Sequence, residues 1–488
     1  MTQFSRRHFL GNSALAAAAA AVSSIPVLGS ELRRSVGANE RLRIAVIGVK
    51  GRGLEHLNQW LKMSDVEVAA ICDIDENVIH GAVDRTEKVS GKKPAYFKDL
   101  RKLFEDKSID AVSVATCNHW HSLAGIWAVQ AGKHAYVEKP ISHNVFEGRK
   151  LVEAGKKHNK VVAVGTQCRS MKGMREAMDF LHSGKLGKVK IARGFCYKSR
   201  KSIGKKPNGP VPSGVDFDIW LGPAPERPFN ANRFHYNWHW FWDTGNGDLG
   251  NQGVHQVDIA RWGLNKNEHP ISTISVGGRL GYEDDGETPN TQITVQDYGD
   301  AQLIFEVRGL DTDKYKDKAI QDKAGQVGIG DVFECTDGYM VIPTYSSGIA
   351  FSPKGEVIQR FGGGDDSAHF RNFIDAIKNN KPESLNAPAI DGHLSAAACH
   401  LANISHRLGT AKPLSTENPF GKNEAGNETY QRFRSHLKEN GVDLEKTNFT
   451  MGREIKFDPK TETVVGDAEA SKLLTREYRK PYVVPENV

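Results

Sequence analysis

Cysteine is scarce in this sequence, with six residues among 488. No two of them form the C-x-x-C pair that structural zinc sites and redox dithiols use, and their density is far below that of a disulfide-stabilised domain. We therefore expect buried free thiols, and neither a zinc site nor a disulfide framework. The six residues are Cys72, Cys117, Cys168, Cys196, Cys335 and Cys399.

The sequence also lacks a large excess of charge and, beyond its N-terminal segment, any long hydrophobic run. The formal net charge is +6, to which Arg6, Arg7, Arg33 and Arg34 contribute. Elsewhere basic and acidic residues are interspersed, which predicts no nucleic-acid partner. No later stretch is apolar over the thickness of a bilayer, so an integral membrane protein is not expected. The 39% hydrophobic and 25% charged residues are typical of a soluble globular protein with room for two domains.

The N-terminus carries the features of an export signal. The run SRRHFL (residues 5–10) precedes a short alanine-rich apolar stretch and then small residues. This order resembles the twin-arginine signal, and the stretch is too short and too weakly hydrophobic for a transmembrane helix. We therefore expect residues 1–38 to be a signal and linker. The twin-arginine export machinery is then an expected partner, and the protein is expected to be periplasmic or otherwise exported.

A glycine-rich turn follows the first strongly apolar run, Leu42–Ile47. Gly48, Gly51 and Gly53 allow the backbone to approach a phosphate, and the helix that begins there can direct its N-terminus at a pyrophosphate. Asp73 ends the next strand 20 residues after Gly53, where a carboxylate can accept hydrogen bonds from ribose hydroxyls and repel a 2′-phosphate. The pattern predicts a dinucleotide site that favours NAD over NADP, although the turn departs from the usual G-x-G-x-x-G spacing.

Strand and helix patterns alternate up to residue 165. This alternation predicts an α/β Rossmann domain over residues 41–165, with a doubly wound parallel sheet and right-handed crossovers. The expected strands are Leu42–Ile47, Val66–Cys72, Ala111–Ala115, His134–Val137 and Val161–Val164. The first expected helix begins near Gly53, and the others are Glu76–Val89, Asp99–Glu105, Ser122–Ala131 and Val145–His158.

After residue 165 the pattern changes to longer strands separated by loops. It predicts an α+β domain over residues 166–413 with a largely antiparallel, open-faced sheet. The expected strands are Val189–Tyr197, Ile271–Leu280, Asn290–Gln296, Ala301–Val307 and Val332–Val341, and the expected helices are Met174–Ser183, His369–Asn379 and Gly392–Leu408. Residues 414–488 are interpreted as a C-terminal extension, whose end (473–485) is expected to wrap a neighbouring surface.

Two segments carry a family resemblance: ATCNHWH (residues 115–121) and AGKHAYVEKP (residues 131–140). Except at Ala135, the second matches AGKHVxxEKP, the hallmark of the glucose–fructose oxidoreductase and inositol dehydrogenase family, Gfo/Idh/MocA, which the chain resembles from about residue 41 to 410. The resemblance implies NAD(P)-dependent oxidation of a CH–OH group and pairing of subunits into a homo-oligomer. The expected cofactor contacts are Gly48, Lys50, Gly51, Arg52, Gly53, Asp73, Thr116, Asn118, His121, Glu138, Lys139 and Gln167.

Lys139 and His255 are the predicted catalytic residues. Lys139 ends a strand at the carboxyl edge of the sheet, where its ammonium can stabilise negative charge on a substrate oxygen and relay its proton; the resemblance also assigns this lysine a catalytic role. Asn251, His255 and Asp258 follow at helical spacing and are expected to face the cofactor, with His255 as a general base whose pKa is near the working pH. A structural histidine is the alternative. In the family pattern D-x-x-x-H-x-x-D an aspartate stands where this chain has Asn251, which can orient a substrate but cannot carry a proton.

Residues 233–262 are rich in tryptophan and histidine. Aromatic faces stack on the C–H faces of sugar rings while polar edges bind hydroxyls, which predicts a carbohydrate site, although each tryptophan taken singly is more often a core or interface anchor. His235 and His239 have the spacing of helical metal ligands, but we expect no helix there and no metal. The expected substrate-binding residues are Asn251, Asp258, Arg169, Trp238, His239 and Trp240.

These features predict an exported oxidoreductase that acts on a secondary hydroxyl of a sugar or sugar derivative. Because a compartment outside the cytoplasmic membrane has no free pool of nicotinamide cofactor, we expect NAD to be tightly bound and reoxidised in place. Two alternatives stay open. One is a redox-neutral, NAD-dependent glycoside hydrolase, similar to some relatives of the family, which oxidises C3, eliminates the C1 substituent, adds water and reduces the ketone. The other is a non-catalytic sugar-binding protein, supported only by Asn251.

Overall fold

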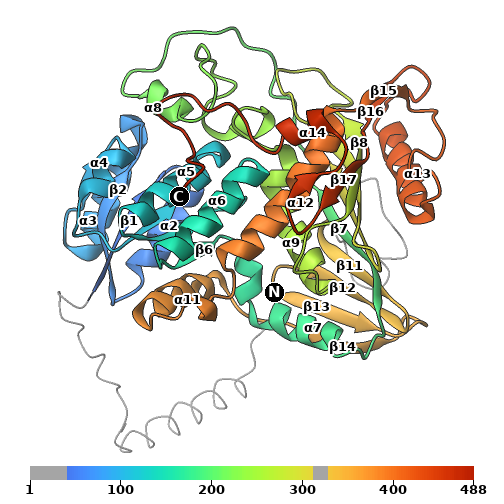
Figure 1. Cartoon of the computed structure of the whole chain (residues 1–488), viewed down its shortest axis with the longest axis horizontal. Helices are drawn as coiled ribbons and strands as arrows, with labels where there is room; N and C mark the ends of the chain where they lie inside the picture. The colour runs from blue at the N-terminus through green and yellow to red at the C-terminus, as the bar shows by residue number, and fades with distance from the viewer. Residues whose placement is uncertain (1–40, 312–327) are drawn as a thin grey trace, which may run out of the picture. The chain divides into compact units, whose positions relative to one another are not determined.

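The computed structural model describes residues 41–311 and 328–488; the predicted export signal lies outside these ranges. The first part is a six-stranded, all-parallel sheet of order β3-β2-β1-β4-β5-β6 (Figure 1). This confirms the predicted Rossmann fold. The strands are β1 (Leu42–Ile47), β2 (Val66–Cys72), β3 (Ala95–Phe97), β4 (Ala111–Val114), β5 (His134–Val137) and β6 (Val162–Val164); the helices are α2 (Arg52–Leu61), α3 (Glu76–Ser90), α4 (Leu100–Glu105), α5 (Asn118–Gln130) and α6 (Val145–Lys157).

Strand β1 shows why this sheet needs helices on both faces. Ile44 and Val46 belong to one apolar cluster, and Ala45 and Ile47 belong to another on the opposite face. All four side chains are almost completely inaccessible to solvent. A strand that is buried on both sides has a continuous apolar sequence, which is why this element was predictable to the residue.

Two elements of this domain differ from the prediction. The edge strand β3 was not predicted, because its three residues are exposed or half-buried and leave no apolar run. Helix α5 begins at Asn118, four residues before the expected start at Ser122. The early turn is held by tertiary contacts, since His119 Nε2 lies 2.9 Å from the Trp220 carbonyl oxygen. Such contacts override the modest helix propensity of asparagine and histidine.

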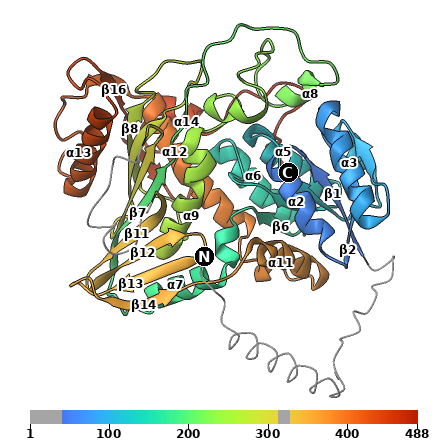
Figure 2. The same cartoon turned by 180° about the vertical axis from the view of Figure 1, so that it is seen from behind.

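The second sheet has twelve strands, and ten of them form the path β14-β13-β12-β11-β7-β10-β9-β8-β16-β15. All its pairs are antiparallel except β7 with β10, so the prediction of a largely antiparallel sheet is confirmed. Figure 2 shows α7 (Lys172–His182), α9 (Val254–Gly263) and α12 (Ala389–Arg407) on one side of it. The strands are β7 (Val189–Tyr197), β8 (Ser272–Gly278), β9 (Thr291–Asp297), β10 (Gln302–Arg308), β11 (Ile329–Cys335), β12 (Gly338–Thr344), β13 (Ser347–Phe351), β14 (Val357–Phe361), β15 (Thr410–Pro413), β16 (Asn448–Met451), β17 (Ile455–Asp458) and β18 (Thr463–Val464).

One predicted strand of this sheet is wrong. The expected single strand Val332–Val341 is a hairpin of β11 and β12, in which Cys335 pairs with Gly338. Thr336 and Asp337 form the turn, and a threonine, an aspartate and the following Gly338 are residue types that should have divided the apolar pattern. The remaining helices are α8 (Phe217–Leu221), α11 (Asp366–Lys378), α13 (Glu424–Glu439) and α14 (Ala468–Lys472), with 3₁₀ turns η2 (Gln167–Ser170), η3 (His235–Trp240) and η5 (Pro382–Ser384) and the π-helical turn η4 (Leu249–Gly253).

After residue 413 the chain first extends the second sheet and only then returns to the first domain. Strands β15, β16 and β17 continue the second sheet beyond β8, and α13 packs on it through a shared apolar cluster. After α14, residues 473–488, which we call the C-terminal strap, cross to the Rossmann domain. There Tyr482, Val484 and Val488 join the same apolar cluster as Trp120.

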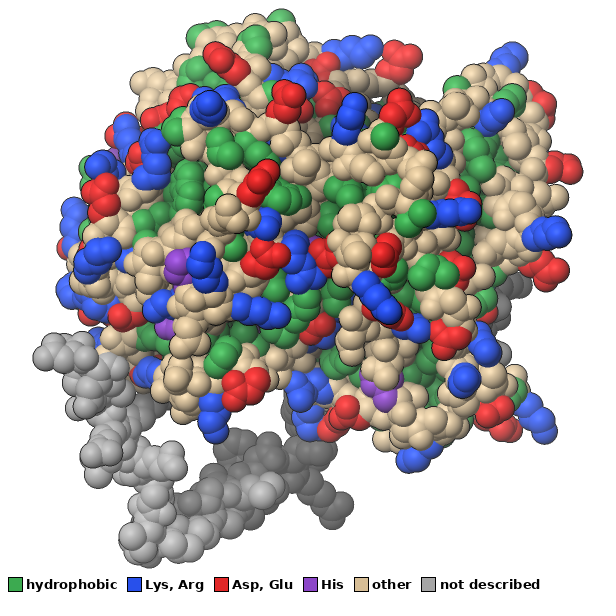
Figure 3. Space-filling model, in the orientation of Figure 1, with side chains coloured by type: hydrophobic (Ala, Val, Ile, Leu, Met, Phe, Trp, Pro, Cys, Tyr) green, Lys and Arg blue, Asp and Glu red, His purple; other side chains and the backbone are tan. Residues whose placement is uncertain are grey.

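The surface carries mixed charge. On the face shown in Figure 3, basic and acidic side chains alternate over most elements. Among the helices of the two described ranges, none combines the length and the apolar character that crossing a membrane requires. All six cysteines lie in these ranges and are free thiols, and four of them are buried.

Candidate functional site

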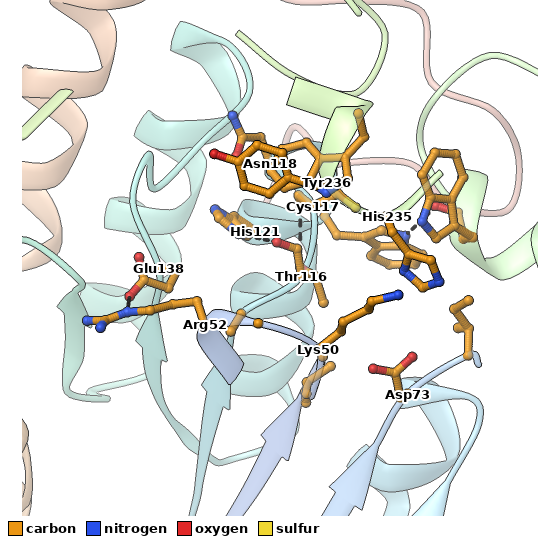
Figure 4. Close-up of a pocket in the computed structure, with 18 of the residues that line it drawn as sticks. Lys50, Arg52, Asp73, Thr116, Cys117, Asn118, His121, Glu138, His235 and Tyr236 are labelled. Atoms are coloured by element: carbon orange, nitrogen blue, oxygen red, sulfur yellow. Dashed lines mark hydrogen bonds and ion pairs between the residues drawn. The ribbon is translucent and has the colours of Figure 1, made fainter. Parts of the chain in front are cut away.

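A cavity of about 580 Å³ opens at the carboxyl ends of β1, β2, β4 and β5 (Figure 4). This is the edge at which open α/β sheets bind ligands, and the volume is in the ordinary range for a small-molecule site. Its walls come from the Rossmann domain on one side and from α8, η3 and the start of α9 on the other. The lining includes Gly48, Lys50, Gly51, Arg52, Asp73, Thr116, Asn118, His121, Glu138, Lys139, Gln167, Trp238, His239, Asn251 and His255 from the predicted set.

The glycine turn has the geometry of a phosphate cradle. Gly48 and Gly51 have positive φ angles of 81° and 62°, which side-chain-bearing residues rarely adopt. A Cβ atom at Gly53 would lie 1.7 Å from the Gly48 carbonyl oxygen, so only glycine allows α2 to begin this close to β1. The N-terminus of α2 then faces the cavity, as a pyrophosphate requires. These residues fit the dinucleotide that the sequence predicts.

Asp73 lies at the end of β2, where the ribose interaction is expected. Its carboxylate accepts hydrogen bonds from the backbone N–H groups of Val49 (2.8 Å) and Asp75 (3.1 Å). Burial nevertheless raises the pKa of Asp73 to about 6. Figure 4 shows Lys50 and His235 beside it, and His235 Nε2 lies 3.0 Å from a carboxylate oxygen of Asp75.

The Glu138 carboxylate, next to Lys139 in the chain, is held by several hydrogen bonds. It accepts hydrogen bonds from Arg52 Nε (2.8 Å) and Lys139 N (3.0 Å), and a further contact comes from His56 Nε2 (2.9 Å). Burial alone would raise its pKa, but the Arg52 guanidinium and the His56 hydrogen bond hold the pKa of Glu138 well below its usual range. Arg52 and Glu138 therefore connect the glycine turn to the strand that carries Lys139.

Lys139, Asn251 and His255 meet at the other end of the cavity. Lys139 Nζ donates a hydrogen bond to the Asn251 carbonyl oxygen at 3.1 Å. Burial lowers the pKa of Lys139. Burial and the Lys139 charge also lower the pKa of His255 to about 3, so its imidazole is neutral at physiological pH. The expectation of a His255 pKa near the working pH is therefore wrong. Its Nδ1 is buried without a hydrogen-bond partner in the described chain, and it can accept a proton from a ligand.

Tyr236 is a cavity residue that sequence reasoning missed. Its hydroxyl oxygen accepts hydrogen bonds from Arg200 Nη1 (3.2 Å) and Asn251 Nδ2 (3.5 Å). Arg200 is itself held by Asp248 through two contacts of 2.7 Å. With both lone pairs engaged, the phenolic proton is free to be donated elsewhere, and the Tyr236 side chain lies in the cavity. The structure also adds Cys117, Trp120, Ile219, Trp220 and His235 to the lining.

Arg169 and Asp258 lie outside the cavity lining, contrary to their predicted place. The Asp258 carboxylate forms two hydrogen bonds with Arg169, at 2.7 and 2.9 Å, and a third with the Ser395 hydroxyl. Asp258 is fully buried, and Arg169 also pairs with Asp391. The two side chains thus fix α9 against α12 and leave no group for a substrate.

The aromatic stretch divides between cavity and core. Trp238 and His239 line the cavity with their rings stacked at a centroid distance of 3.6 Å. Trp240, predicted to bind substrate, is buried outside the lining, where the Arg200 guanidinium lies 5.1 Å from its ring. Thr116, Asn118 and His121 of the Rossmann domain also line the cavity.

The two histidines with metal-like spacing do not form a pair of ligands. Residues 235–240 form the short 3₁₀ helix η3, so the expectation of no helix there is wrong. Because a 3₁₀ helix has three residues per turn, positions i and i+4 lie on different faces of it. Within the described ranges one group, His269, His393 and Glu462, has metal-like geometry. There Arg149 and both histidines contact the Glu462 carboxylate. The negative charge that a metal ion would need is therefore already paired with the Arg149 guanidinium.

Family models match most of the described chain. Residues 42–166 match the oxidoreductase family model described as an NAD-binding Rossmann fold, and residues 174–439 match its C-terminal alpha/beta domain. Curated relatives include a glycosyl hydrolase family 109 protein of Shewanella sp. strain ANA-3, 34% identical over 177 residues, and an alpha-N-acetylgalactosaminidase of Shewanella oneidensis, 32% identical over 177 residues. Each alignment covers 33% of this chain and 39% of the relative. The matched region thus spans about two fifths of these relatives.

Solved structures share the fold at low sequence identity. The WlbA dehydrogenase from Bordetella pertussis, solved with NADH and UDP-GlcNAcA, superposes with a TM-score of 0.54 at 16% identity, over 74% of this chain and 96% of that one. The UDP-N-acetylglucosamine 3-dehydrogenase GnnA from Acidithiobacillus ferrooxidans gives 0.51 at 15% identity, over 75% and 97%. With both family models matched in order, the chain belongs to the Gfo/Idh/MocA oxidoreductase family.

Proposed function

We propose that this protein is an NAD-dependent oxidoreductase that acts on a secondary hydroxyl of a sugar or sugar derivative and keeps its cofactor bound. The observation that carries the proposal is the meeting of Lys139, Asn251, His255 and Tyr236 in the cavity that also holds the glycine turn and Asp73. Gly48, Gly51, Arg52 and Asp73 would hold the dinucleotide. When bound, its nicotinamide supplies the acceptor for a hydride from the substrate carbon.

The chain's own residues handle the proton and the charge. Lys139 offers an ammonium whose pKa is lowered by burial, so it can donate a hydrogen bond to the reacting oxygen and exchange a proton with it. His255 is neutral and can accept the hydroxyl proton. Tyr236, with Arg200 and Asn251 donating to its oxygen, offers an O–H donor to a second substrate oxygen.

Several observations support a sugar as the substrate. Trp238 and His239 present stacked rings at the cavity, which suits the C–H face of a pyranose. Relatives and fold neighbours carry names that refer to sugars or nucleotide sugars. We further propose that the protein is exported through the twin-arginine signal and that its cofactor is NAD rather than NADP. We also propose that two copies pair through the second sheet, which sedimentation of the mature protein tests.

Redox-neutral glycoside hydrolysis is the second candidate. The similarity to glycosyl hydrolase family 109 proteins favours it, although it covers only part of their length. In this reaction the same cavity must also remove the C2 proton of the oxidised sugar and release the C1 substituent. Neutral His255 and the Tyr236 hydroxyl are the available base and acid.

Asn251→Asp distinguishes the two candidates. In a dehydrogenase the new carboxylate beside Lys139 and one helical turn before His255 raises the imidazole's basicity, and sugar-dependent formation of NADH is expected to rise by up to about ten-fold. In a hydrolase the added negative charge opposes the enolate-like intermediate, and the reaction is expected to slow. Single-turnover absorbance at the NADH band measures the first reaction, and release of a chromogenic C1 substituent measures the second.

The control for this experiment is Asn251→Ala, which removes the amide without adding charge. The simple dehydrogenase would be overturned if the wild type releases the C1 substituent and exchanges the C2 hydrogen for solvent deuterium, and if Asn251→Asp slows both events. Asn251→Ala should then slow them only as far as the lost amide contact requires. Faster NADH formation without either event would overturn the hydrolase.

The raised pKa of Asp73 predicts a pH-dependent affinity for the cofactor. The ionised carboxylate accepts hydrogen bonds from ribose hydroxyls better than the protonated acid does. Because the pKa is about 6, NAD binding is expected to weaken as pH falls from about 7 to about 5, by up to about ten-fold per unit below the pKa. The dissociation constant, measured by titration at each pH, checks this. Asp73→Asn is expected to bind weakly at every pH, and an unchanged pH dependence in that variant would assign the titration to another group.

A further inference from the structure

The C-terminal strap, residues 473–488, is built into the Rossmann domain. Tyr482 is 1% exposed, and its ring packs edge-on against Trp120 at a centroid distance of 5.5 Å. Val484 and Val488 are buried in the same apolar cluster. Both cartoon views place the C-terminus over this domain (Figures 1 and 2). Burial of this kind fixes the position of the strap and is more than a loose tail requires.

Polar groups of the strap hold helix α8. The Tyr482 hydroxyl donates to a carboxylate oxygen of Asp218 at 2.8 Å. Arg479 pairs with the same carboxylate and also donates to the carbonyl oxygens of Asp218 (2.5 Å) and Gly222 (3.0 Å). The strap thus donates hydrogen bonds to both ends of helix α8, at Asp218 near its start and at Gly222 directly after it.

The residues between these two anchors form a wall of the cavity. Ile219 and Trp220 line it, together with Trp120, whose Nε1 donates to the Ile219 carbonyl oxygen at 2.9 Å. A Cβ atom at Gly222 would lie 2.3 Å from the Trp120 ring, so α8 and α5 are in close contact there. One surface of Trp120 therefore faces the cavity while another contacts Tyr482 of the strap.

The segment before α8 is attached to the ribose end of the cavity. Glu76 N donates to the Gly214 carbonyl oxygen (3.1 Å), and Asp216 N donates to the Ile74 carbonyl oxygen (3.0 Å). Ile74 follows Asp73, the residue expected to bind the adenosine ribose. Residues 213–222, which we call the covering segment, therefore run from the neighbourhood of Asp73 to the strap, past the part of the cavity that is expected to hold the adenosine ribose.

We infer that Arg479 and Tyr482 are positioning residues for the cofactor, which hold the covering segment over the adenosine half of the dinucleotide and so slow its release. This inference rests on the proposed function. It assigns the retention of NAD to an enclosure completed by the last residues of the chain, and it explains why a segment so remote in sequence contacts a wall of the cavity. Neither residue contacts the reacting end of the site, where Lys139 and His255 lie.

The test compares Arg479→Ala, Tyr482→Phe and the double variant with the full-length wild type. Tyr482→Phe keeps the buried ring and removes only the hydroxyl. Arg453→Ala is the matched control, because this exposed arginine pairs with Asp467 and Glu469 in the same extension and away from the cavity. Release of bound NAD is followed by a chase with isotope-labelled NAD. Binding of ADP-ribose and of nicotinamide mononucleotide is measured by calorimetry after the nucleotide has been removed.

The double variant is expected to release NAD about ten-fold faster than the wild type and to bind ADP-ribose about ten-fold more weakly, with binding of nicotinamide mononucleotide unchanged. Tyr482→Phe should show part of this effect and Arg453→Ala none. Equal ADP-ribose binding by the double variant and the wild type, or equal weakening of both half-ligands, would overturn the inference. A wild type that loses NAD during purification would instead refute the proposed retention, while the ADP-ribose comparison would still decide the role of the strap.

Discussion

Lys139→Ala is expected to lower turnover by about 100-fold or more while the protein retains its nucleotide. The ammonium lies next to Asn251 and His255, at the end of the cavity where we propose that the substrate reacts, and not at the glycine turn. Removal of a positioned electrostatic or acid–base group of this kind typically costs two orders of magnitude or more in rate. Turnover of a sugar panel and the nucleotide content of denatured protein are the two measurements.

Lys139→Arg and Lys102→Ala are the comparisons for this variant. Lys139→Arg keeps the positive charge, but its guanidinium cannot lose a proton at physiological pH. This variant should therefore restore binding of the substrate without restoring proton exchange with it. Lys102 is an exposed lysine that pairs with Glu105, and its removal should leave turnover unchanged. Full activity in Lys139→Ala would remove this lysine from the mechanism, and loss of the nucleotide would show that its role is in cofactor binding.

Gly53→Ala is expected to abolish cofactor retention. The added Cβ would lie 1.7 Å from the Gly48 carbonyl oxygen, so α2 must move away from β1. Overpacking of this size costs about 3 kcal/mol, which corresponds to about 100-fold in affinity if the cost falls on the bound conformation. The nucleotide content of purified protein and the dissociation constant for added NAD measure the effect.

Gly81→Ala is the matched substitution. Gly81 lies in α3, and its new Cβ would meet nothing within 4 Å in the described part of the chain. Replacing a helical glycine by alanine should stabilise the protein by about 0.5–1 kcal/mol and leave NAD binding intact. A Gly53→Ala protein with full nucleotide content would refute the phosphate-cradle interpretation of the turn.

The parallel half of the fold was predictable because a strand that is buried on both faces has a continuous apolar run in the sequence. Leu42–Ile47 and Val66–Cys72 match the observed strands residue for residue. Where such an apolar run is absent or is not interrupted at a turn, the prediction of strands fails. Strand β3 is short and exposed, and the β11–β12 hairpin joins two apolar runs through only two residues.

The candidate site was predictable where a residue is fixed by the end of a strand. Asp73, Glu138 and Lys139 follow β2 and β5 directly, so their place at the carboxyl edge follows from the parallel sheet. Tyr236 and Trp220 belong to the long connection between β7 and α9, whose sequence has no regular period that would place them.

Helical spacing alone did not decide which residues of α9 meet the cavity. Asn251 lies in the π-helical turn η4 and His255 in the first turn of α9, and both line the cavity. Asp258 is turned into the protein because Arg169, 89 residues earlier in the chain, forms two hydrogen bonds with it. The sequence shows which side chains share a face, and only the tertiary partner shows where that face points.

The central claim is that a sugar hydroxyl is oxidised in this cavity by NAD that the protein already holds. The most direct test is stopped-flow absorbance at the NADH band, with protein purified without added cofactor and mixed with a panel of free sugars and chromogenic glycosides. We predict that at least one sugar or glycoside raises the band within a single turnover, and that Lys139→Ala, with its nucleotide still bound, shows no such rise. An unchanged band with every member of the panel, in protein that releases NAD on denaturation, would contradict the account.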